Sequence, residues 1–331
     1  MKLCIVGGGP SAFYLSRFLH KHFDIDIYEK TNKPFGLFNL FSHRFENNPF
    51  TKDLEKVKIF YNKKLNKLPE GYDVYAIAIG GVENKLNIEG NEHVMTAIEA
   101  CNKIQKDLQL HNQSDKNIKS FFNTKDKIII IGMGNTSLDI ASDLFKLGIE
   151  KVKIFSRNNF YKFTIPEIKT LLRDNITIKL KNLKDTIKNN ILSKNSLHSI
   201  ENNNTNKTID KIQNTELLKN NRIIDPITKL KETLNKFKNN SMKNLSLFFN
   251  TEPLKIEKKD NLILHTNTKE YEADHIITSI GYNKPDISSF KDHNKKIYTI
   301  GWANMKSGNL ADVFYDCKNK AKEILKDNNI E

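Results

Sequence analysis

The first glycine-rich turn of the chain, GGGPSA at residues 7–12, follows a short apolar run and opens a stretch with helical periodicity. Gly7 permits a tight turn, Gly9 lets a pyrophosphate approach the backbone, and the small Ala12 lets helix and strand pack closely. The start of the helix offers free N–H groups and the positive end of its dipole to phosphates. Glu29 ends the next strand, about 20 residues on, where a carboxylate accepts hydrogen bonds from ribose hydroxyls. This pattern predicts a dinucleotide site for a ribose that carries no 2′-phosphate.

A second turn of the same kind, GMGNTS, lies well inside the chain and again stands between an apolar strand and a helical pattern. Gly132, Gly134 and Ser137 repeat the order of two glycines and a small residue, although serine replaces the usual glycine or alanine. Asn135 and Thr136 present side chains and backbone N–H groups toward the same space. The repeat predicts a second pyrophosphate site.

The strand after the second turn ends differently from the strand after the first. Arg157 stands where the first unit has Glu29. A carboxylate at this place repels a 2′-phosphate, whereas an arginine clamps one with charge-assisted hydrogen bonds. The first site is therefore predicted to bind FAD and the second to prefer NADP over NAD. A chain with two such sites facing each other can pass a hydride between cofactors, and this chemistry needs no catalytic side chain and no metal.

Two further apolar strands end in glycine, YAIAIGG and HIITSIGYNKP, and they flank the second unit. A strand that closes on glycine lets the backbone turn sharply out of a sheet, so we interpret both as crossings between domains. The sequence predicts an α/β fold of two Rossmann-like dinucleotide-binding domains. We expect a discontinuous FAD-binding domain at 1–95 and 275–331 and an inserted NADP-binding domain at 96–274, with a low-complexity region of helices and loops at 183–250.

The composition restricts the other classes of function. The chain has 331 residues, a net charge of +14 and three cysteines. Cys4, Cys101 and Cys317 form no CxxC, which excludes a redox dithiol and the usual zinc spacings. The positive charge indicates an acidic partner, but the abundance of Lys, Asn and Ile throughout the chain explains it equally well. No apolar run reaches the roughly 20 residues of a membrane span, and no leader sequence is visible.

Stretches along nearly the whole chain resemble, in order, motifs of the adrenodoxin reductase family of NADPH:ferredoxin reductases: IVGGGPSAFYLSRFL, DIYEKTNKPFGL, IIIGMGNTSLDIA, KFTIPEI, SIGY and IGW. The resemblance is weak in residues 45–70 and 183–250. It implies FAD contacts from Ser11, Glu29, Leu37 and Trp302. It implies NADP contacts from Met133, Gly134, Asn135, Thr136, Arg157 and Glu167.

The segment after Trp302 departs from the family, whose Gly-Pro-Thr-Gly stands here as ANMKSGNL. If Gly308 matches the last glycine, the resemblance implies that Gly308, Asn309 and Leu310 open the final helix against the flavin. Gly308 then also lies near the nicotinamide. Asn158 replaces the second of two family arginines, which changes the expected strength of the NADP preference and not its direction.

The stretch after FGL departs further, because the flavin-lining Asp-His of the family is replaced by FNLFSHRFENN. His43 can stand for the family histidine, with Asp139 as its partner. A surface-loop histidine and a solvated or helix-capping aspartate explain the two residues equally well.

The resemblance implies an FAD enzyme that takes a hydride from NADPH and releases electrons singly to an acidic [2Fe–2S] ferredoxin, for iron–sulfur cluster assembly. Lys162, Lys169 and Arg173 are expected to steer the ferredoxin. We expect a monomer without a nucleic-acid partner or a transmembrane segment. Family members work in the mitochondrial matrix, so we expect the matrix or a mitochondrion-derived organelle such as a mitosome, with the cytoplasm as the alternative.

Two other functions stay open on the sequence. An NADPH oxidase or quinone reductase would turn over small acceptors with no gain from ferredoxin. A non-catalytic basic scaffold would be colourless and would bind nucleic acid with a strong salt dependence. The intact glycine turns, Glu29 and Arg157 argue against the scaffold.

Overall fold

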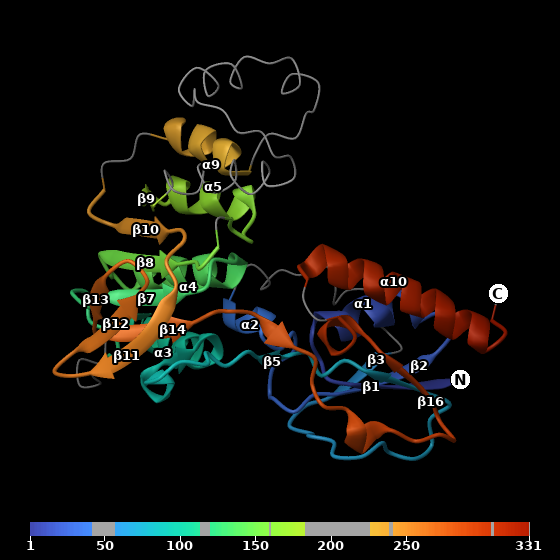
Figure 1. Cartoon of the computed structure of the whole chain (residues 1–331). Helices are drawn as coiled ribbons and strands as arrows, with labels where there is room; N and C mark the ends of the chain where they lie inside the picture. The colour runs from blue at the N-terminus through green and yellow to red at the C-terminus, as the bar shows by residue number, and fades with distance from the viewer. Residues whose placement is uncertain are drawn as a thin grey trace, which may run out of the picture. The chain divides into compact units, whose positions relative to one another are not determined.

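The computed structural model divides the chain into two units, each built on a parallel sheet (Figure 1). The structure describes residues 1–41, 57–112, 120–158, 160–182, 226–237, 241–305 and 308–330. The first unit comprises Met1–Lys85, Thr96–Gln105 and Ile280–Glu331, and the second comprises Leu86–Met95 and Lys106–Ser279. The predicted α/β fold with Rossmann-like sheets is confirmed.

The first unit is a five-stranded sheet in the order β16-β4-β1-β2-β3, in which every neighbouring pair is parallel. Its strands are β1 (Lys2–Val6), β2 (Asp24–Tyr28), β3 (Val57–Phe60), β4 (Val74–Ile77) and β16 (Lys296–Thr299). Helix α1 (Pro10–Leu19) connects β1 to β2, and α10 (Leu310–Asp327) follows β16 and packs beside α1 (Figure 1). The smaller elements are α2 (Phe38–Phe41), η4 (Ser288–Phe290), η5 (Gly301–Ala303), and the antiparallel pair β5 (Val82–Glu83) and β15 (Tyr282–Asn283).

Strand β1 is buried on both faces, which explains why its sequence is a continuous apolar run. Leu3 and Ile5 belong to the core that the sheet forms with α1 and α10. Cys4 and Val6 belong to the core on the opposite face, which also contains Phe290. Because successive side chains of a strand alternate between faces, β1 anchors the sheet from both sides and fixes where the turn at Gly7 begins.

The second unit contains a six-stranded sheet in the order β6-β14-β7-β8-β10-β9. Its strands are β6 (Met95–Thr96), β7 (Ile128–Ile131), β8 (Lys151–Phe155), β9 (Thr177–Lys181), β10 (Asn244–Phe248) and β14 (His275–Thr278). The pairs from β14 to β9 are all parallel. The helical elements of this unit are η3 (Asn91–His93), α4 (Asn135–Lys146), α5 (Ile165–Arg173) and α9 (Pro226–Asn235). Helix α3 (Ala97–Asn112) begins in the first unit and ends in the second.

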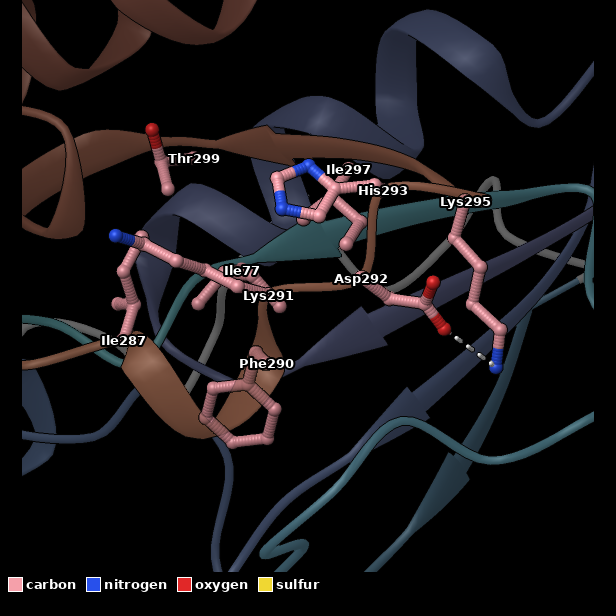
Figure 2. A pocket seen from close by; sticks show the side chains of 9 residues that line it. All are labelled: Ile77, Ile287, Phe290, Lys291, Asp292, His293, Lys295, Ile297 and Thr299. Atoms are coloured by element: carbon pink, nitrogen blue, oxygen red, sulfur yellow. Dashed lines mark ion pairs between the residues drawn. The ribbon is translucent and has the colours of Figure 1, made fainter.

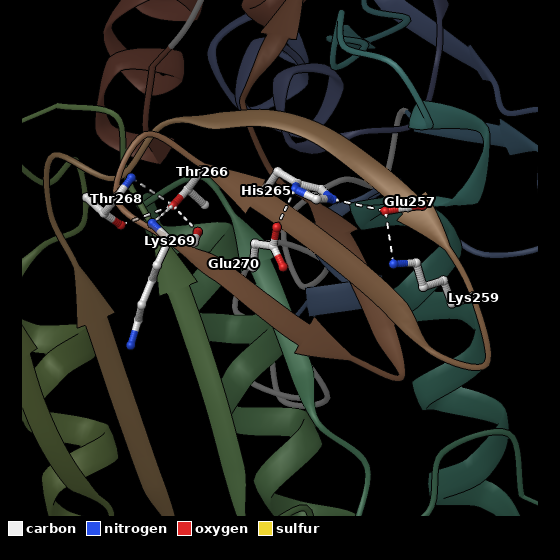
Figure 3. A network of polar contacts seen from close by, with 7 residues as sticks. All are labelled: Glu257, Lys259, His265, Thr266, Thr268, Lys269 and Glu270. Carbon is white, nitrogen blue, oxygen red and sulfur yellow. Dashed lines mark hydrogen bonds and ion pairs between the residues drawn. The ribbon is translucent and has the colours of Figure 1, made fainter.

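A three-stranded antiparallel sheet completes the second unit: β11 (Pro253–Lys258), β12 (Leu262–Thr266) and β13 (Glu270–Ala273). His265 on β12 lies between two carboxylates, with Nε2 3.3 Å from Glu257 and Nδ1 3.1 Å from Glu270 (Figure 3). The hydroxyl of Thr266 donates to the carbonyl of Lys269 at 2.6 Å and closes the turn from β12 to β13. These contacts join adjacent strands, and we interpret the network as a structural one.

The second unit begins earlier in the chain than the sequence predicts. Residues 86–95, expected in the FAD-binding domain, lie in the second unit. The N–H of Ile256 on β11 donates to the carbonyl of Glu89 at 2.9 Å, and Lys255 forms an ion pair with the Glu89 carboxylate at 3.0 Å. Gly90 has a φ of +81° and lies directly against the Ile256 carbonyl, where no Cβ fits. These contacts attach the segment to β11.

The other boundaries also differ from the predicted ones. Residues 96–105 lie in the first unit, where the N–H of Ile98 donates to the carboxylate of Glu83 at 3.0 Å. Residues 275–279 lie in the second unit, because β14 pairs with β7 and extends its sheet. With these limits the chain passes between the units four times: after β5, within β6, within α3 and after β14.

The region 183–250, expected to hold only helices and loops, also supplies a strand. Strand β10 lies between β8 and β9 and has buried Leu245, Leu247 and Phe248. The prediction of helix is confirmed at α9, and residues 183–225 and 238–240 lie outside the described part of the chain.

Among the helices that the structure describes, none combines the length and apolar character needed to cross a membrane. Within the same residues, no group of three or more His, Cys, Asp or Glu side chains has a geometry that could hold a metal ion.

Candidate functional site

The candidate site of the first unit lies at the carboxyl edge of its sheet. Since the strands are parallel, the residues that follow them meet at this edge: Gly7 after β1, Glu29 after β2, Ala78 after β4 and Gly301 after β16. The chain order of the strands reverses between β1 and β4. Open α/β sheets bind ligands at such a switch point, outside the carboxyl ends of the strands.

The first glycine turn has one crowded glycine and one open glycine. Gly7 has a φ of +102°, and a Cβ there would lie 2.5 Å from the carbonyl oxygen of Ala78. Gly9 precedes the first residue of α1, where no side chain caps the helix start, and no heavy atom lies within 4 Å of the place its Cβ would take. Gly7 therefore serves the turn, and Gly9 leaves the helix start open to an anion.

Glu29 is 4% exposed and accepts three hydrogen bonds. Oε2 accepts the N–H of Gly8 at 2.6 Å, and Oε1 accepts the N–H and the hydroxyl of Thr31, both at 2.8 Å. A carboxylate has about four acceptor positions, so Oε2 keeps one for a further donor such as a ribose hydroxyl. Glu29 thus holds the glycine turn and still offers an acceptor at the edge of the sheet.

The loop that contains Phe35 lies across the first turn, a contact that the sequence does not predict. Phe35 has a φ of +71°, and its N–H donates to the carbonyl of Gly8 at 2.7 Å. Its ring lies 4.4 Å from the ring of Phe13 on α1. Leu37, a predicted FAD contact, follows directly in this loop and is half-buried. In the sequence, the Pro34-Phe35-Gly36 turn and the family motif DIYEKTNKPFGL mark this loop, but neither indicates its contact with Gly8.

The carboxyl-terminal residues assigned to FAD lie together in the first unit. The indole Nε1 of Trp302 donates to the carbonyl of Gly308 at 3.2 Å. Asn309 uses its side chain to cap α10, of which Leu310 is the first residue. Ser11, in the first turn of α1, is buried directly beneath Gly301. The structure thus brings these residues to the carboxyl end of β16, beside the start of α1.

The second unit repeats the construction. Gly132 directly follows β7 with a φ of +115°, and Gly134 precedes α4 with no heavy atom within 4 Å of where its Cβ would lie. The buried hydroxyl of Ser137 donates to the carbonyl of Gly132 at 2.7 Å. Serine at the third position therefore fits, because its hydroxyl bonds the turn instead of separating helix from strand.

A second loop crosses this turn in the same way as the first. The N–H of Lys162 donates to the carbonyl of Met133 at 2.8 Å, just as Phe35 donates to Gly8. The N–H of Thr164 donates to the side-chain oxygen of Asn135 at 2.8 Å. The side chain of Asn135 thus holds this loop, and the half-buried Thr136 follows it in α4.

The register of the two units corrects one prediction. Gly7 donates its N–H to Tyr28, and Gly132 donates its N–H to Phe155, so the next residues, Glu29 and Ser156, correspond. Arg157 lies one residue farther on and is exposed. The second unit therefore has a small neutral residue where the first has a carboxylate, and the arginine follows it.

The other predicted residues of the second unit lie on or before α5 and α4. Glu167, in the first turn of α5, has a buried Oε2 without a hydrogen-bond partner among the described residues. Asp139 is half-buried on α4. His43 lies outside the described residues, so its predicted pairing with Asp139 stays a prediction. Lys162, Lys169 and Arg173 are all exposed.

A cavity of about 380 Å³ opens elsewhere in the first unit, against β16 and the loop before it (Figure 2). Its lining consists of Ile77, Ile287, Phe290, Lys291, Asp292, His293, Lys295, Ile297 and Thr299. Ile77, Phe290 and Ile297 belong to the core on the face of the sheet away from α1 and α10. Its lining includes none of the residues predicted to contact a cofactor, so the candidate cofactor site remains the region around Gly7, Glu29 and Gly301.

All three thiols are buried, with exposed fractions of 0%, 2% and 0% for Cys4, Cys101 and Cys317. Burial raises the pKa of the Cys4 and Cys317 thiols to about 12, with smaller contributions from nearby carboxylates. Reactive thiols are exposed and have a low pKa. We expect a disulfide reagent such as DTNB to titrate no thiol in the folded protein and three thiols in the denatured protein. A thiol that reacts within seconds in the folded state would contradict this.

Comparisons with known proteins agree with these features. A family model described as pyridine nucleotide-disulphide oxidoreductase matches residues 98–242. The mitochondrial NADPH:adrenodoxin oxidoreductase of Drosophila melanogaster is 28% identical over 160 residues, which cover 42% of this chain and 33% of that protein. The corresponding Arabidopsis thaliana protein is 27% identical over 165 residues, covering 44% and 33%. The predicted resemblance to adrenodoxin reductases is confirmed, and the chain spans about a third of the length of these relatives.

Among solved structures, the thioredoxin reductase of Lactococcus lactis matches with a TM-score of 0.57 at 14% identity, covering 98% of both chains. This match shows the fold.

Proposed function

We propose that this adrenodoxin-reductase-like chain is an NADPH:ferredoxin oxidoreductase that holds FAD in its first unit and NADPH in its second. The observation that carries the proposal is the pair of open glycine turns, each of which has different residues after the neighbouring strand. Glu29 follows β2 beside the first turn, whereas Ser156 and Arg157 follow β8 beside the second turn. A carboxylate suits a ribose with free hydroxyls, and an arginine suits a 2′-phosphate.

The first unit fits FAD in three respects. Gly9 leaves the start of α1 uncapped and open, which suits a pyrophosphate. Glu29 keeps one acceptor for a ribose hydroxyl. Trp302 and Leu37 supply apolar surface for the flavin ring. Bound FAD would accept a hydride from NADPH and release the electrons one at a time, and the protein would supply binding, orientation and electrostatics.

The second unit fits NADPH in comparable respects. Gly134 leaves the start of α4 open to a pyrophosphate. The buried, unpartnered carboxylate oxygen of Glu167 can accept a bond from an amide or hydroxyl donor of the nucleotide. Arg157 is exposed and can turn its guanidinium to the 2′-phosphate. We also place Gly308, near the nicotinamide, with the NADP contacts.

The proposed electron acceptor is an acidic [2Fe–2S] ferredoxin, which the net charge of +14 would attract. Lys169 and Arg173 lie four residues apart on α5, so they share one face of the helix, and Lys162 precedes it. We assign this basic surface to ferredoxin docking. We also infer a role in iron–sulfur cluster assembly, in mitochondria or a mitochondrion-derived organelle, because the curated relatives are mitochondrial.

The acceptor is tested by following NADPH-dependent reduction of cytochrome c with and without an added [2Fe–2S] ferredoxin. The proposal expects a rate that rises with ferredoxin and falls with salt. Lys169→Glu and Arg173→Glu should each raise the KM for ferredoxin several-fold, since each removes steering charge. Lys258→Glu, an equal charge change on an exposed lysine of β11, should not. Turnover that ferredoxin does not increase would favour the oxidase or quinone reductase.

A further inference from the structure

A carboxylate on the last helix holds a short turn at the end of β16. The turn consists of η5 and the following Asn304. Asp316 on α10 accepts the N–H of Gly301 at Oδ2, 2.7 Å, and the side-chain amide of Asn304 at Oδ1, 2.8 Å. Both oxygens of one carboxylate thus bind residues on either side of Trp302.

Trp302 is also fixed from other directions. Its Nε1 donates to the carbonyl of Gly308, and its ring centroid lies 4.7 Å from that of Tyr282. Gly301 has a φ of +59° and lies directly against the side chain of Ser11, where no Cβ fits. The turn that carries Trp302 therefore lies against the first turn of α1, where we place the pyrophosphate.

The helix start does not depend on Asp316. The side chain of Asn309 accepts the N–H groups of Ala311 and Asp312 at 2.8 and 3.1 Å. The carboxylate of Asp312 accepts the N–H of Asn309 at 2.8 Å, which completes a capping box. Asp316 lies beyond this box, and the bonds of its carboxylate go to the turn. Its effect is therefore on the position of Trp302.

We propose that Asp316 is a positioning residue of the flavin site, which sets the place of Trp302 by holding Gly301 and Asn304. The inference rests on the proposed function, because it takes the surface beside Trp302 as the flavin site. Hydrogen bonds to an ionised acceptor are shorter and stronger than neutral ones. A carboxylate is thus suited to keep this turn in one position whether or not the cofactor is bound.

The chain supplies its own reporter for this inference, since Trp302 is its only tryptophan. Tryptophan fluorescence, excited at a wavelength where the ten tyrosines do not absorb, therefore reports this turn alone in the FAD-free protein. Asp316→Ala removes both bonds, and Asn304→Asp places two carboxylates face to face. We expect both variants to shift the emission to longer wavelength and to expose Trp302 to acrylamide. We expect FAD affinity to fall about tenfold in each, because bonds to a charged group are lost.

A double variant and a control separate positioning from general stability. Asn304→Asp combined with Asp316→Asn exchanges donor and acceptor, so it should restore the wild-type emission and FAD affinity. Asp327→Ala removes another α10 carboxylate, which accepts the hydroxyl of Tyr298 at 2.7 Å. This control should lower the Tm and leave the fluorescence and FAD affinity unchanged.

The inference is overturned if Asp316→Ala lowers the Tm but leaves the emission and FAD affinity at wild-type values. It is also overturned if the double variant behaves like Asn304→Asp alone. Wild-type protein that takes up no FAD would contradict the proposed function instead. The fluorescence of the FAD-free variants would then still decide whether Asp316 holds Trp302.

Discussion

Gly7→Ala is expected to lower the free energy of unfolding by about 2–3 kcal/mol. The methyl group would lie 2.5 Å from the carbonyl oxygen of Ala78, on a backbone with a φ of +102°. The clash is with main chain at the end of β4, so no side-chain rotation relieves it. Urea or thermal unfolding of the FAD-free protein, followed by circular dichroism, measures the loss.

Gly9→Ala is the matched control, because Gly9 has a φ of −77° and open space around its Cβ position. Its unfolding free energy should change by less than about 0.5 kcal/mol. Its affinity for FAD should fall by about 100-fold, because the methyl group occupies the approach of the pyrophosphate. Full FAD affinity in Gly9→Ala would place the pyrophosphate elsewhere, and unchanged stability in Gly7→Ala would refute the geometry of the turn.

Ser156→Glu is expected to reverse the preference for NADPH over NADH. The register places Ser156 at the position of Glu29, so the new carboxylate would stand where it repels a 2′-phosphate and accepts ribose hydroxyls. We expect kcat/KM for NADPH to fall by about 100-fold, equivalent to about 2.7 kcal/mol, while that for NADH is kept or rises. Reduction of ferricyanide with each coenzyme measures both values.

Two variants separate charge from size at this site. Ser156→Gln has the shape of the glutamate without its charge, so it should keep the preference for NADPH. Arg157→Ala should lower the affinity for NADPH and leave the affinity for NADH unchanged, because only NADPH has the 2′-phosphate that the arginine binds. If Ser156→Glu and Ser156→Gln lower kcat/KM for NADPH equally, the effect is steric, and the assignment of the 2′-phosphate to this edge is wrong.

The two glycine turns could be predicted because their cause is local. Gly7 and Gly132 both have a positive φ, which a side chain rarely adopts, and both directly follow a buried strand. The motif encodes that backbone and the helix start after it. The parallel sheets follow from the same units, because a strand, a helix and a second strand of this length pair in parallel.

The position of Arg157 could not be predicted, because it depends on where β8 ends. That end is marked by the hydrogen bond from the N–H of Gly132, directly after β7, to the carbonyl of Phe155 on the neighbouring strand β8. A shift of one residue decides whether Arg157 or Ser156 occupies the position that Glu29 has in the first unit. The sequence does not show which residues of β7 and β8 pair. The same reason hid β10, which lies between β8 and β9 although it follows both in the chain.

The contacts of the two loops with the glycine turns could not be predicted for another reason. Phe35 and Lys162 act through backbone N–H groups, which every residue but proline has. Side-chain type therefore gives no signal for the contacts with Gly8 and Met133. The sequence shows only that a turn follows Pro34, and the structure shows what the turn contacts.

The central claim is that one chain holds FAD and reduces it with NADPH. The measurement that tests it most directly is the visible spectrum of the purified protein, incubated with FAD, before and after anaerobic addition of NADPH or NADH. The account predicts a yellow protein that NADPH bleaches faster and at lower concentration than NADH. A protein that stays colourless after incubation with FAD would contradict the account.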